Sequence, residues 1–189
     1  MGRGIAVLAA AMLLALAGHA QAQGYDSRDV MGGGPTFFDG GASPIPRTTV
    51  SYASTYSPGT IVINTAERRL YLVLPNGQAL RYGVGVGRDG FRWSGVHRVS
   101  AKKEWPGWTP PSQMRRRRPD LPGHMAGGID NPLGARAMYL GSTLYRIHGS
   151  NEPETIGQAV SSGCFRMTND DVTDLYGRVA VGTTVVVKN

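Results

Sequence analysis

The sequence has little of several residue types: a single cysteine among 189 residues, 17% charged residues and 8% aromatic residues. One cysteine cannot form a disulfide within the chain, so a disulfide framework is excluded. The 27 glycines and 12 prolines disfavour a helical bundle, and 41% hydrophobic residues are too many for a wholly disordered chain. A chain of this length has room for one compact domain and a tail. We therefore expect one β-rich domain.

The sequence also lacks an apolar run of the roughly 20 residues that a membrane-spanning helix needs. The apolar run 5–17 is shorter, follows Arg3, and is followed by the small-residue pattern A-Q-A that ends at Ala22. This order is typical of a secretory signal peptide, although a buried N-terminal helix is the alternative. We expect residues 1–22 to be cleaved after Ala22, which leaves no transmembrane anchor and places the protein in the periplasm.

Residues 23–57 contain glycine runs and prolines but no sustained apolar period of 2 or 3.6. This composition predicts a flexible linker. The linker sums to a charge of −1 and the signal to +1, so residues 58–189 carry the whole net charge of +7. A basic domain suits nucleic acid or an anionic polymer outside the cytoplasm, and charge alone does not separate the two.

Short apolar segments separated by turn residues predict the strands of this domain. The expected strands are 61–64, 70–74, 80–86, 137–147 and 183–188. Asn76-Gly77 predicts a hairpin between the second and third of them, because both residues tolerate positive φ.

Two short helices are expected, at 154–159 and 169–176, and Thr168 or Asn169 is the expected N-cap of the second. Between Trp93 and Pro132 the sequence shows little periodicity. A stretch of this length predicts a long, lid-like loop over a binding surface.

The lone cysteine, Cys164, lies in the string VSSGCFRM, shortly before the expected helix 169–176. A single cysteine is more often a small buried hydrophobic residue. Here the preceding glycine and the following helix start form a place where backbone N–H groups can converge on an oxyanion. His148 stands sixteen residues earlier, at the end of an apolar run.

A cysteine thiol with its ordinary pKa of about 8.5 is only slightly ionised at neutral pH. If His148 accepts the proton of Cys164, the resulting ion pair supplies a nucleophile, and the same proton can later pass to a leaving amine. The imidazole also needs a group that orients it. The sequence places no acid there, so we expect a backbone carbonyl beside His148 to do so.

Six strings of the domain resemble the L,D-transpeptidases with the YkuD catalytic domain, in particular the ErfK/YbiS type of Gram-negative bacteria: IVINTAERRLYLVL, YGVGVGR, WTPPSQM, RRPDLPGHMAGGIDNPLGARAMYLG, YRIHGSNEPETIGQAVSSGCFRM and VGTTVVVKN. Together they cover nearly all of 58–189. The HG…SSGCFRM element is specific, whereas YGVGVGR is weak alone. The resemblance implies a β-rich α+β fold, a YkuD-type β-sandwich with short helices and a lid-like loop, without cofactor or metal.

The resemblance also implies a role for each matching residue. Many members of the family have His and Asn where Ser162 and Arg166 stand here, and the ErfK/YbiS branch commonly shows the same change. The implied roles are the nucleophile Cys164, the general base and acid His148, the orienting carbonyl of Gly149, an oxyanion hole from the N–H groups of Ser162, Gly163 and Cys164, and substrate contacts from Arg166, Ser161 and Trp93.

The implied substrate is the peptidoglycan stem tetrapeptide, with Cys164 forming an acyl-enzyme at meso-diaminopimelate. The acyl acceptor is then a second diaminopimelate, giving 3–3 cross-links, or an outer-membrane protein or lipoprotein that becomes attached to the wall. Three alternatives stay open: an L,D-carboxypeptidase or hydrolase with the same acyl-enzyme, a non-catalytic wall-binding module, and a papain-like protease. The last is disfavoured because papain-like folds usually place the cysteine before the histidine.

Other polar residues have simpler readings. His97 and His124 show no metal-ligand spacing, so no metal site is expected. The run Arg115 to Arg118 resembles a nucleic-acid patch, but export makes nucleic acid an unsuitable partner. A solvated loop face or contact with anionic envelope polymers is the expectation instead.

Overall fold

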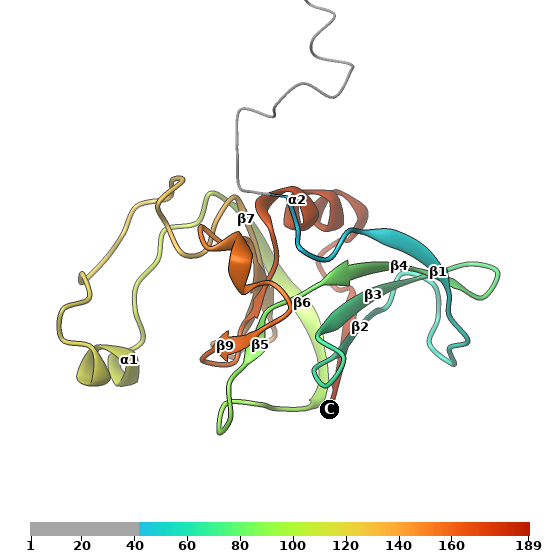
Figure 1. The fold of residues 1–189 in the computed structure, drawn as a ribbon, viewed down its shortest axis with the longest axis horizontal. Helices are drawn as coiled ribbons and strands as arrows, with labels where there is room; N and C mark the ends of the chain where they lie inside the picture. Colours follow the sequence, from blue (N-terminus) through green and yellow to red (C-terminus); the bar gives the residue numbers. More distant parts are fainter. Residues whose placement is uncertain (1–41) are drawn as a thin grey trace, which may run out of the picture. The chain divides into compact units, whose positions relative to one another are not determined.

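The computed structural model describes residues 42–189, whose regular secondary structure is mostly β-strand (Figure 1). The predicted signal peptide and residues 23–41 of the predicted linker lie outside the described residues. The elements are β1 Thr48–Ser51, β2 Ile61–Asn64, β3 Arg69–Leu74, β4 Gln78–Gly83, β5 Val86–Gly87, β6 Gly95–Glu104, α1 Ser112–Arg117, β7 Arg136–Leu140, β8 Arg146–His148, a 3₁₀ turn Pro153–Thr155, β9 Ala159–Ser161, β10 Phe165–Arg166, α2 Asn169–Arg178 and β11 Thr184–Lys188.

Within the described residues, nine strands form one sheet in the order β1-β4-β3-β2-β11-β6-β7-β8-β10, and β5 pairs with β9 in a second, small sheet. Strand β6 joins the two halves of the large sheet, because its first residues pair with β11 and its later residues pair with β7. The register shifts between Val99 and Ala101. An irregularity of this kind bends a strand, so the sheet curls around one core. The predicted β-rich, sandwich-like fold is confirmed.

The core of the curled sheet takes side chains from both halves. Alternate residues of each strand point inward because the side-chain period of a strand is 2. Tyr82, Met138 and Phe165 are among the largest buried side chains. The predicted hairpin at Asn76-Gly77 is confirmed, since it joins β3 to β4 and both residues have positive φ, 61° and 67°.

Three predicted elements are wrong in their extent. The expected strand 137–147 is interrupted by a turn around Gly141, at φ 58°, and becomes the hairpin of β7 and β8. The expected strand 80–86 leaves β3 at Gly83, after which β5 pairs with β9 instead. The expected helix 154–159 is only a 3₁₀ turn, because Gly157 has a φ of 85° and the chain then extends into β9.

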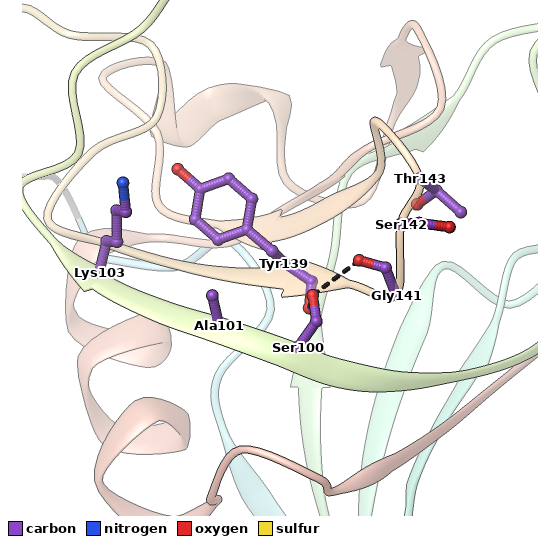
Figure 2. Close-up of a pocket in the computed structure, with 7 residues that line it drawn as sticks. All are labelled: Ser100, Ala101, Lys103, Tyr139, Gly141, Ser142 and Thr143. Atoms are coloured by element: carbon purple, nitrogen blue, oxygen red, sulfur yellow. Dashed lines mark hydrogen bonds between the residues drawn. The ribbon is translucent and has the colours of Figure 1, made fainter.

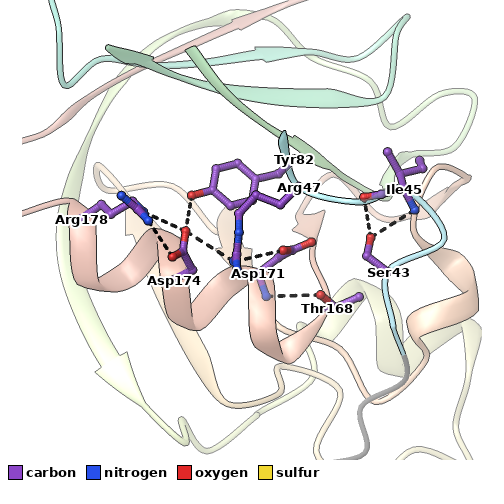
Figure 3. A network of polar contacts seen from close by, with 8 residues as sticks. All are labelled: Ser43, Ile45, Arg47, Tyr82, Thr168, Asp171, Asp174 and Arg178. Carbon is purple, nitrogen blue, oxygen red and sulfur yellow. Dashed lines mark hydrogen bonds and ion pairs between the residues drawn. The ribbon is translucent and has the colours of Figure 1, made fainter. Parts of the chain in front are cut away.

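The segment predicted as a flexible linker contributes to the fold near its end. Strand β1 pairs antiparallel with β4, and the Arg47 guanidinium lies 3.3 Å from an Asp171 oxygen and 3.4 Å from an Asp174 oxygen of α2. The Tyr82 hydroxyl donates to Asp174 at 2.6 Å, which extends the network (Figure 3). The folded domain therefore includes residues that precede residue 58.

Helix α2 confirms the prediction for 169–176 and has partners at both ends. The Thr168 side chain caps it by accepting the Asp171 N–H at 3.3 Å. At the other end the Lys102 ammonium donates to the carbonyls of Tyr176 and Val179, at 2.7 and 2.6 Å. A cation is favourable at this end because of the helix dipole. No helix within 42–189 has the length and apolar character to cross a membrane.

The stretch predicted as a loop from Trp93 to Pro132 is divided. Its first part is strand β6, whose alternation the sequence did not reveal. The remainder belongs to the loop 105–135, which contains α1. Two backbone hydrogen bonds of 2.8 Å between Trp108 and Met125 join the two sides of this loop. Figure 1 shows α1 at a distance from the sheet. Arg117 lies over the Phe91 ring at 5.3 Å, so the loop also contacts the segment after β5.

Candidate active site

The pairing of two short parallel strands brings the predicted nucleophile and base to one place. In β10 and β8, Phe165 is opposite Ile147 and Arg166 is opposite His148. Phe165 and Ile147 are fully buried in the core. Because side chains alternate along a strand, His148, Arg166 and Cys164 share the other face.

His148 is buried, with 5% of its surface exposed. Its Nδ1 lies 2.5 Å from the carbonyl oxygen of Gly149. A carbonyl can only accept, so this contact assigns the ring proton to Nδ1 and leaves the Nε2 lone pair available to accept another proton.

The protonation state of His148 follows from its surroundings. Burial lowers its pKa to about 3, although the hydrogen bond to Gly149 acts in the opposite direction, and the charges of Arg166 and Arg146 lower it further. At neutral pH the imidazole is therefore uncharged. This differs from the resting thiolate–imidazolium pair that the sequence suggested, and it suits a base that takes the proton during attack.

Cys164 lies in the turn between β9 and β10 and is partly buried. Its Sγ is 3.7 Å from the carbonyl oxygen of Leu144. Burial raises the pKa of the thiol, whereas hydrogen bonds and charge from Arg146, together with the charge of Arg166, lower it. The two arginines thus favour the thiolate and disfavour the imidazolium, so negative charge can develop on the sulfur during the reaction.

The turn that carries Cys164 is held by Ser161 and Trp93. The Ser161 hydroxyl donates to the Cys164 carbonyl at 2.6 Å and accepts the Gly163 N–H at 3.1 Å. The Trp93 indole N–H donates to the Gly163 carbonyl at 2.8 Å. Gly163 has a φ of 110°, and a Cβ there would lie 2.5 Å from Tyr145. Only glycine therefore satisfies both the backbone angle and the packing.

These contacts bear on the residues that the sequence predicted as an oxyanion hole. The Gly163 N–H is occupied by Ser161 Oγ. Within the described part of the chain, the N–H groups of Ser162 and Cys164 have no hydrogen-bond acceptor. Two of the three expected donors are thus free to bind a substrate oxygen.

The residues that the sequence predicted as substrate contacts have partners within the protein. Ser161 and Trp93 donate hydrogen bonds to backbone carbonyls of the turn that carries Cys164. Arg166 donates to a Glu152 carboxylate oxygen at 2.6 Å and lies 3.4 Å from Thr155 Oγ1. Its charge is therefore already balanced in this state of the protein.

Sequence reasoning did not identify several residues of the site. Arg146 is one of them, and its signal was present: it stands two positions before His148 in a strand, so the two share a face. Asn169 is another. Its Oδ1 accepts the Ala135 N–H at 2.8 Å, and a Cβ added to Gly149 would lie 2.4 Å from this oxygen, so a side chain at position 149 would clash with it. Glu152, the partner of Arg166, left no signal in the sequence.

The histidines and arginines for which the sequence predicted no catalytic role make other contacts. His97 packs edge-on against Trp93, with 5.3 Å between ring centroids, and His124 Nδ1 lies 2.9 Å from Thr109 Oγ1. Arg115 and Arg116 are in α1. The residues from 42 to 189 contain no group of three or more His, Cys, Asp and Glu placed to hold a metal ion.

Known proteins match most of the described part of the chain. The family model of the L,D-transpeptidase catalytic domain, YkuD, matches residues 58–187. The probable L,D-transpeptidase ErfK/SrfK of Escherichia coli K12 is 42% identical over 134 residues, which are 66% of this chain and 42% of that protein. The chain thus spans less than half the length of this curated relative.

Two solved structures are similar as well. An L,D-transpeptidase from Mycobacterium smegmatis matches with a TM-score of 0.56 and 16% identity, over 69% of this chain and 58% of that one, which shows the shared fold. A Brucella melitensis protein described as a probable carnitine operon oxidoreductase is 47% identical, with a TM-score of 0.53, over 78% of this chain and 96% of that one. Its description names another activity, which is that protein's alone. The family match includes His148 and Cys164, and this chain belongs to the L,D-transpeptidase family with the YkuD catalytic domain, as the ErfK/YbiS-like strings predicted.

Proposed function

We propose that this protein is a cysteine L,D-transpeptidase that acts on the stem tetrapeptides of peptidoglycan in the periplasm. The observation that carries the proposal is the hydrogen bond from His148 Nδ1–H to the Gly149 carbonyl. It fixes the tautomer in which Nε2 can accept a proton, and strand register places this ring on the same sheet face as Cys164. A cysteine without a catalytic role would not need an oriented, uncharged imidazole on the same sheet face.

Acylation would proceed as follows. His148 Nε2 accepts the Cys164 thiol proton while Sγ bonds to the carbonyl carbon of the third residue, meso-diaminopimelate. The carbonyl oxygen becomes an oxyanion, which the N–H groups of Ser162 and Cys164 stabilise. The tetrahedral intermediate then breaks its bond to the terminal D-Ala, whose amine takes the proton from His148. The product is a thioester on Cys164 and free D-Ala.

Deacylation would use an amine in place of the thiol. The side-chain amine of a second diaminopimelate loses a proton to His148 and attacks the thioester, which gives a 3–3 cross-link and restores the thiol. An amine of an envelope protein would attach that protein to the wall by the same steps. Such an enzyme contributes to cell wall biogenesis and cell shape.

A test of the proposal compares acceptors. The full chain is incubated with a stem tetrapeptide and an excess of an amine-bearing stem peptide, and the products are separated by liquid chromatography and mass spectrometry. We expect cross-linked peptides and release of D-Ala from the parent, and neither from Cys164→Ala. Tripeptide as the sole product would overturn the proposed transferase activity and support a carboxypeptidase activity instead. Wall binding by the parent without any reaction would support a non-catalytic module.

Export is a separate part of the proposal. It rests on the charged start, short apolar run and A-Q-A pattern of residues 1–22. We expect protein recovered from a Gram-negative host to be periplasmic and to begin at Gln23. An uncleaved N-terminus, or recovery from the cytoplasm, would contradict this part.

A further inference from the structure

The sheet face that carries Cys164 continues beyond the reacting groups. Cys164 precedes β10 by one residue, so the register Phe165–Ile147 places Arg146 across from it. Arg146 in turn pairs with Tyr139 of β7, and Tyr139 pairs with Ala101 of β6. Because neighbouring strands are about 4.8 Å apart, Tyr139 stands about 10 Å from the nucleophile along a direct row of side chains.

A second row runs beside the first. His148 pairs with Ala137, and Ala137 pairs with Lys103. Side chains two positions apart in a strand share a face, so Lys103 stands on the same face as Tyr139, His148 and Cys164. Figure 2 shows Lys103 and Tyr139 rising from the same side of the sheet.

A pocket of about 370 Å³ opens at the far end of these rows, lined by Lys103, Tyr139, Ser100 and the turn 141–143 among others (Figure 2). The same β7–β8 turn also reaches the nucleophile, because the Leu144 carbonyl is in contact with Cys164 Sγ. Both the strand register and this turn therefore connect the pocket to the site of acylation.

Two positive charges flank Tyr139, and of these Lys103 lines the pocket. The Arg146 guanidinium lies 5.2 Å from the centre of the Tyr139 ring and the Lys103 ammonium 5.9 Å from it. Within residues 42–189 neither side chain forms a salt bridge, and the buried Nε of Arg146 has no hydrogen-bond acceptor. Arg166, by contrast, forms an ion pair with Glu152.

We propose that this pocket is a subsite for a carboxylate of the peptide substrate, held by the Lys103 ammonium beside Tyr139, with Arg146 adding positive charge from the neighbouring strand; the inference rests on the proposed function. The Lys103 ammonium has three donors and forms no salt bridge within the described residues, so it can bind an anionic group of the substrate. An extended peptide advances about 3.3 Å per residue, so the pocket lies within about three residues of the scissile bond. Both the tetrapeptide donor and the amine-bearing acceptor carry a carboxylate within that range.

The test removes the charge of Lys103, because Arg146 also touches the nucleophile and would change the thiol itself. We expect Lys103→Met to raise KM about fivefold for a peptide with a free carboxylate, with kcat unchanged, which is the size of an exposed charge pair. The same variant should not change KM for the matching peptide amide. Lys103→Arg should restore the parent value.

Lys188→Met is the matched control, since it removes an equal charge from the exposed end of β11. Two arms identify the source of the carboxylate. In one the donor tetrapeptide is compared with its C-terminal amide, and in the other the acceptor peptide is compared with its amide at the amine-bearing centre. A Lys103 effect confined to the acid form of either peptide supports the subsite and names its occupant.

Equal effects on acid and amide forms in both arms, or effects no larger than those of Lys188→Met, would overturn the subsite. These outcomes differ from failure of the proposed function. In that case the parent protein would form no acyl-enzyme with any of these peptides.

Discussion

Burial of an uncharged His148 predicts a loss of stability in acid that one substitution should remove. The pKa of His148 is lowered to about 3 in the folded protein, first by burial, whereas an unfolded histidine has a pKa of about 6.5. Between these values the unfolded chain binds a proton that the folded chain does not. The free energy of unfolding therefore falls as pH decreases through this window, by about 1.4 kcal/mol per pH unit. At about pH 4 the loss from this residue reaches roughly 3 kcal/mol.

Urea unfolding followed by tryptophan fluorescence, at about pH 7 and about pH 4, measures this contribution. Carboxylates also titrate in the window, but they are common to the parent and to His148→Gln, so they cancel in the difference between the two free energies. We expect that difference to shift by roughly 3 kcal/mol in favour of the variant at the lower pH. An unchanged difference at the two pH values would show that His148 has its ordinary pKa in the folded protein, contrary to the effect of its burial.

Three further predictions concern the turn and the helix. Gly163→Ala should destabilise the fold by about 1–3 kcal/mol, because a Cβ would lie 2.5 Å from Tyr145 at a φ of 110°. An unchanged urea midpoint would contradict this. Trp93→Phe keeps an aromatic ring but loses the hydrogen bond to the Gly163 carbonyl, so acylation should slow about tenfold and the free energy of unfolding should fall by about 1 kcal/mol. Unchanged acylation kinetics would show that this hydrogen bond does not position the turn. Arg47→Met should lower the free energy of unfolding by about 1 kcal/mol, since it leaves the α2 carboxylates near it, including Asp174, without this cation; an unchanged urea midpoint would show that the network adds no stability.

Features with a local cause were predictable from the sequence. Asn76 and Gly77 form the hairpin because both accept positive φ whatever surrounds them. Helix α2 begins after Thr168 because a hydroxyl at that position satisfies an N–H of the first turn. The strands β2, β3 and β11 follow from short runs of branched, apolar residues.

Features that depend on distant partners were not predictable. Strand β1 has only four residues, TTVS, and although three of them are β-branched, it forms a strand by pairing with the open edge of β4. The bend of β6 results from its pairing with β11 on one side and β7 on the other. A single sequence contains no record of either pairing.

The candidate site shows the same division. The string around Cys164 and the dipeptide His148-Gly149 pointed to the chemistry, since each role depends on the residue type. The assignment of Ser161 to substrate did not anticipate that its hydroxyl bridges the Gly163 N–H and the Cys164 carbonyl. Whether Arg166 faces substrate or a carboxylate depends on where Glu152 lies after folding, and spacing along the chain does not specify this.

The most direct measurement of the central claim is the intact mass of the protein during reaction with a stem tetrapeptide. We expect a covalent tripeptidyl adduct that peptide mapping places on Cys164. The adduct should be absent from Cys164→Ala, and it should form roughly a hundredfold more slowly in His148→Gln, the size expected for loss of a general base. An unmodified parent protein, or an adduct that forms equally fast without His148, would contradict it.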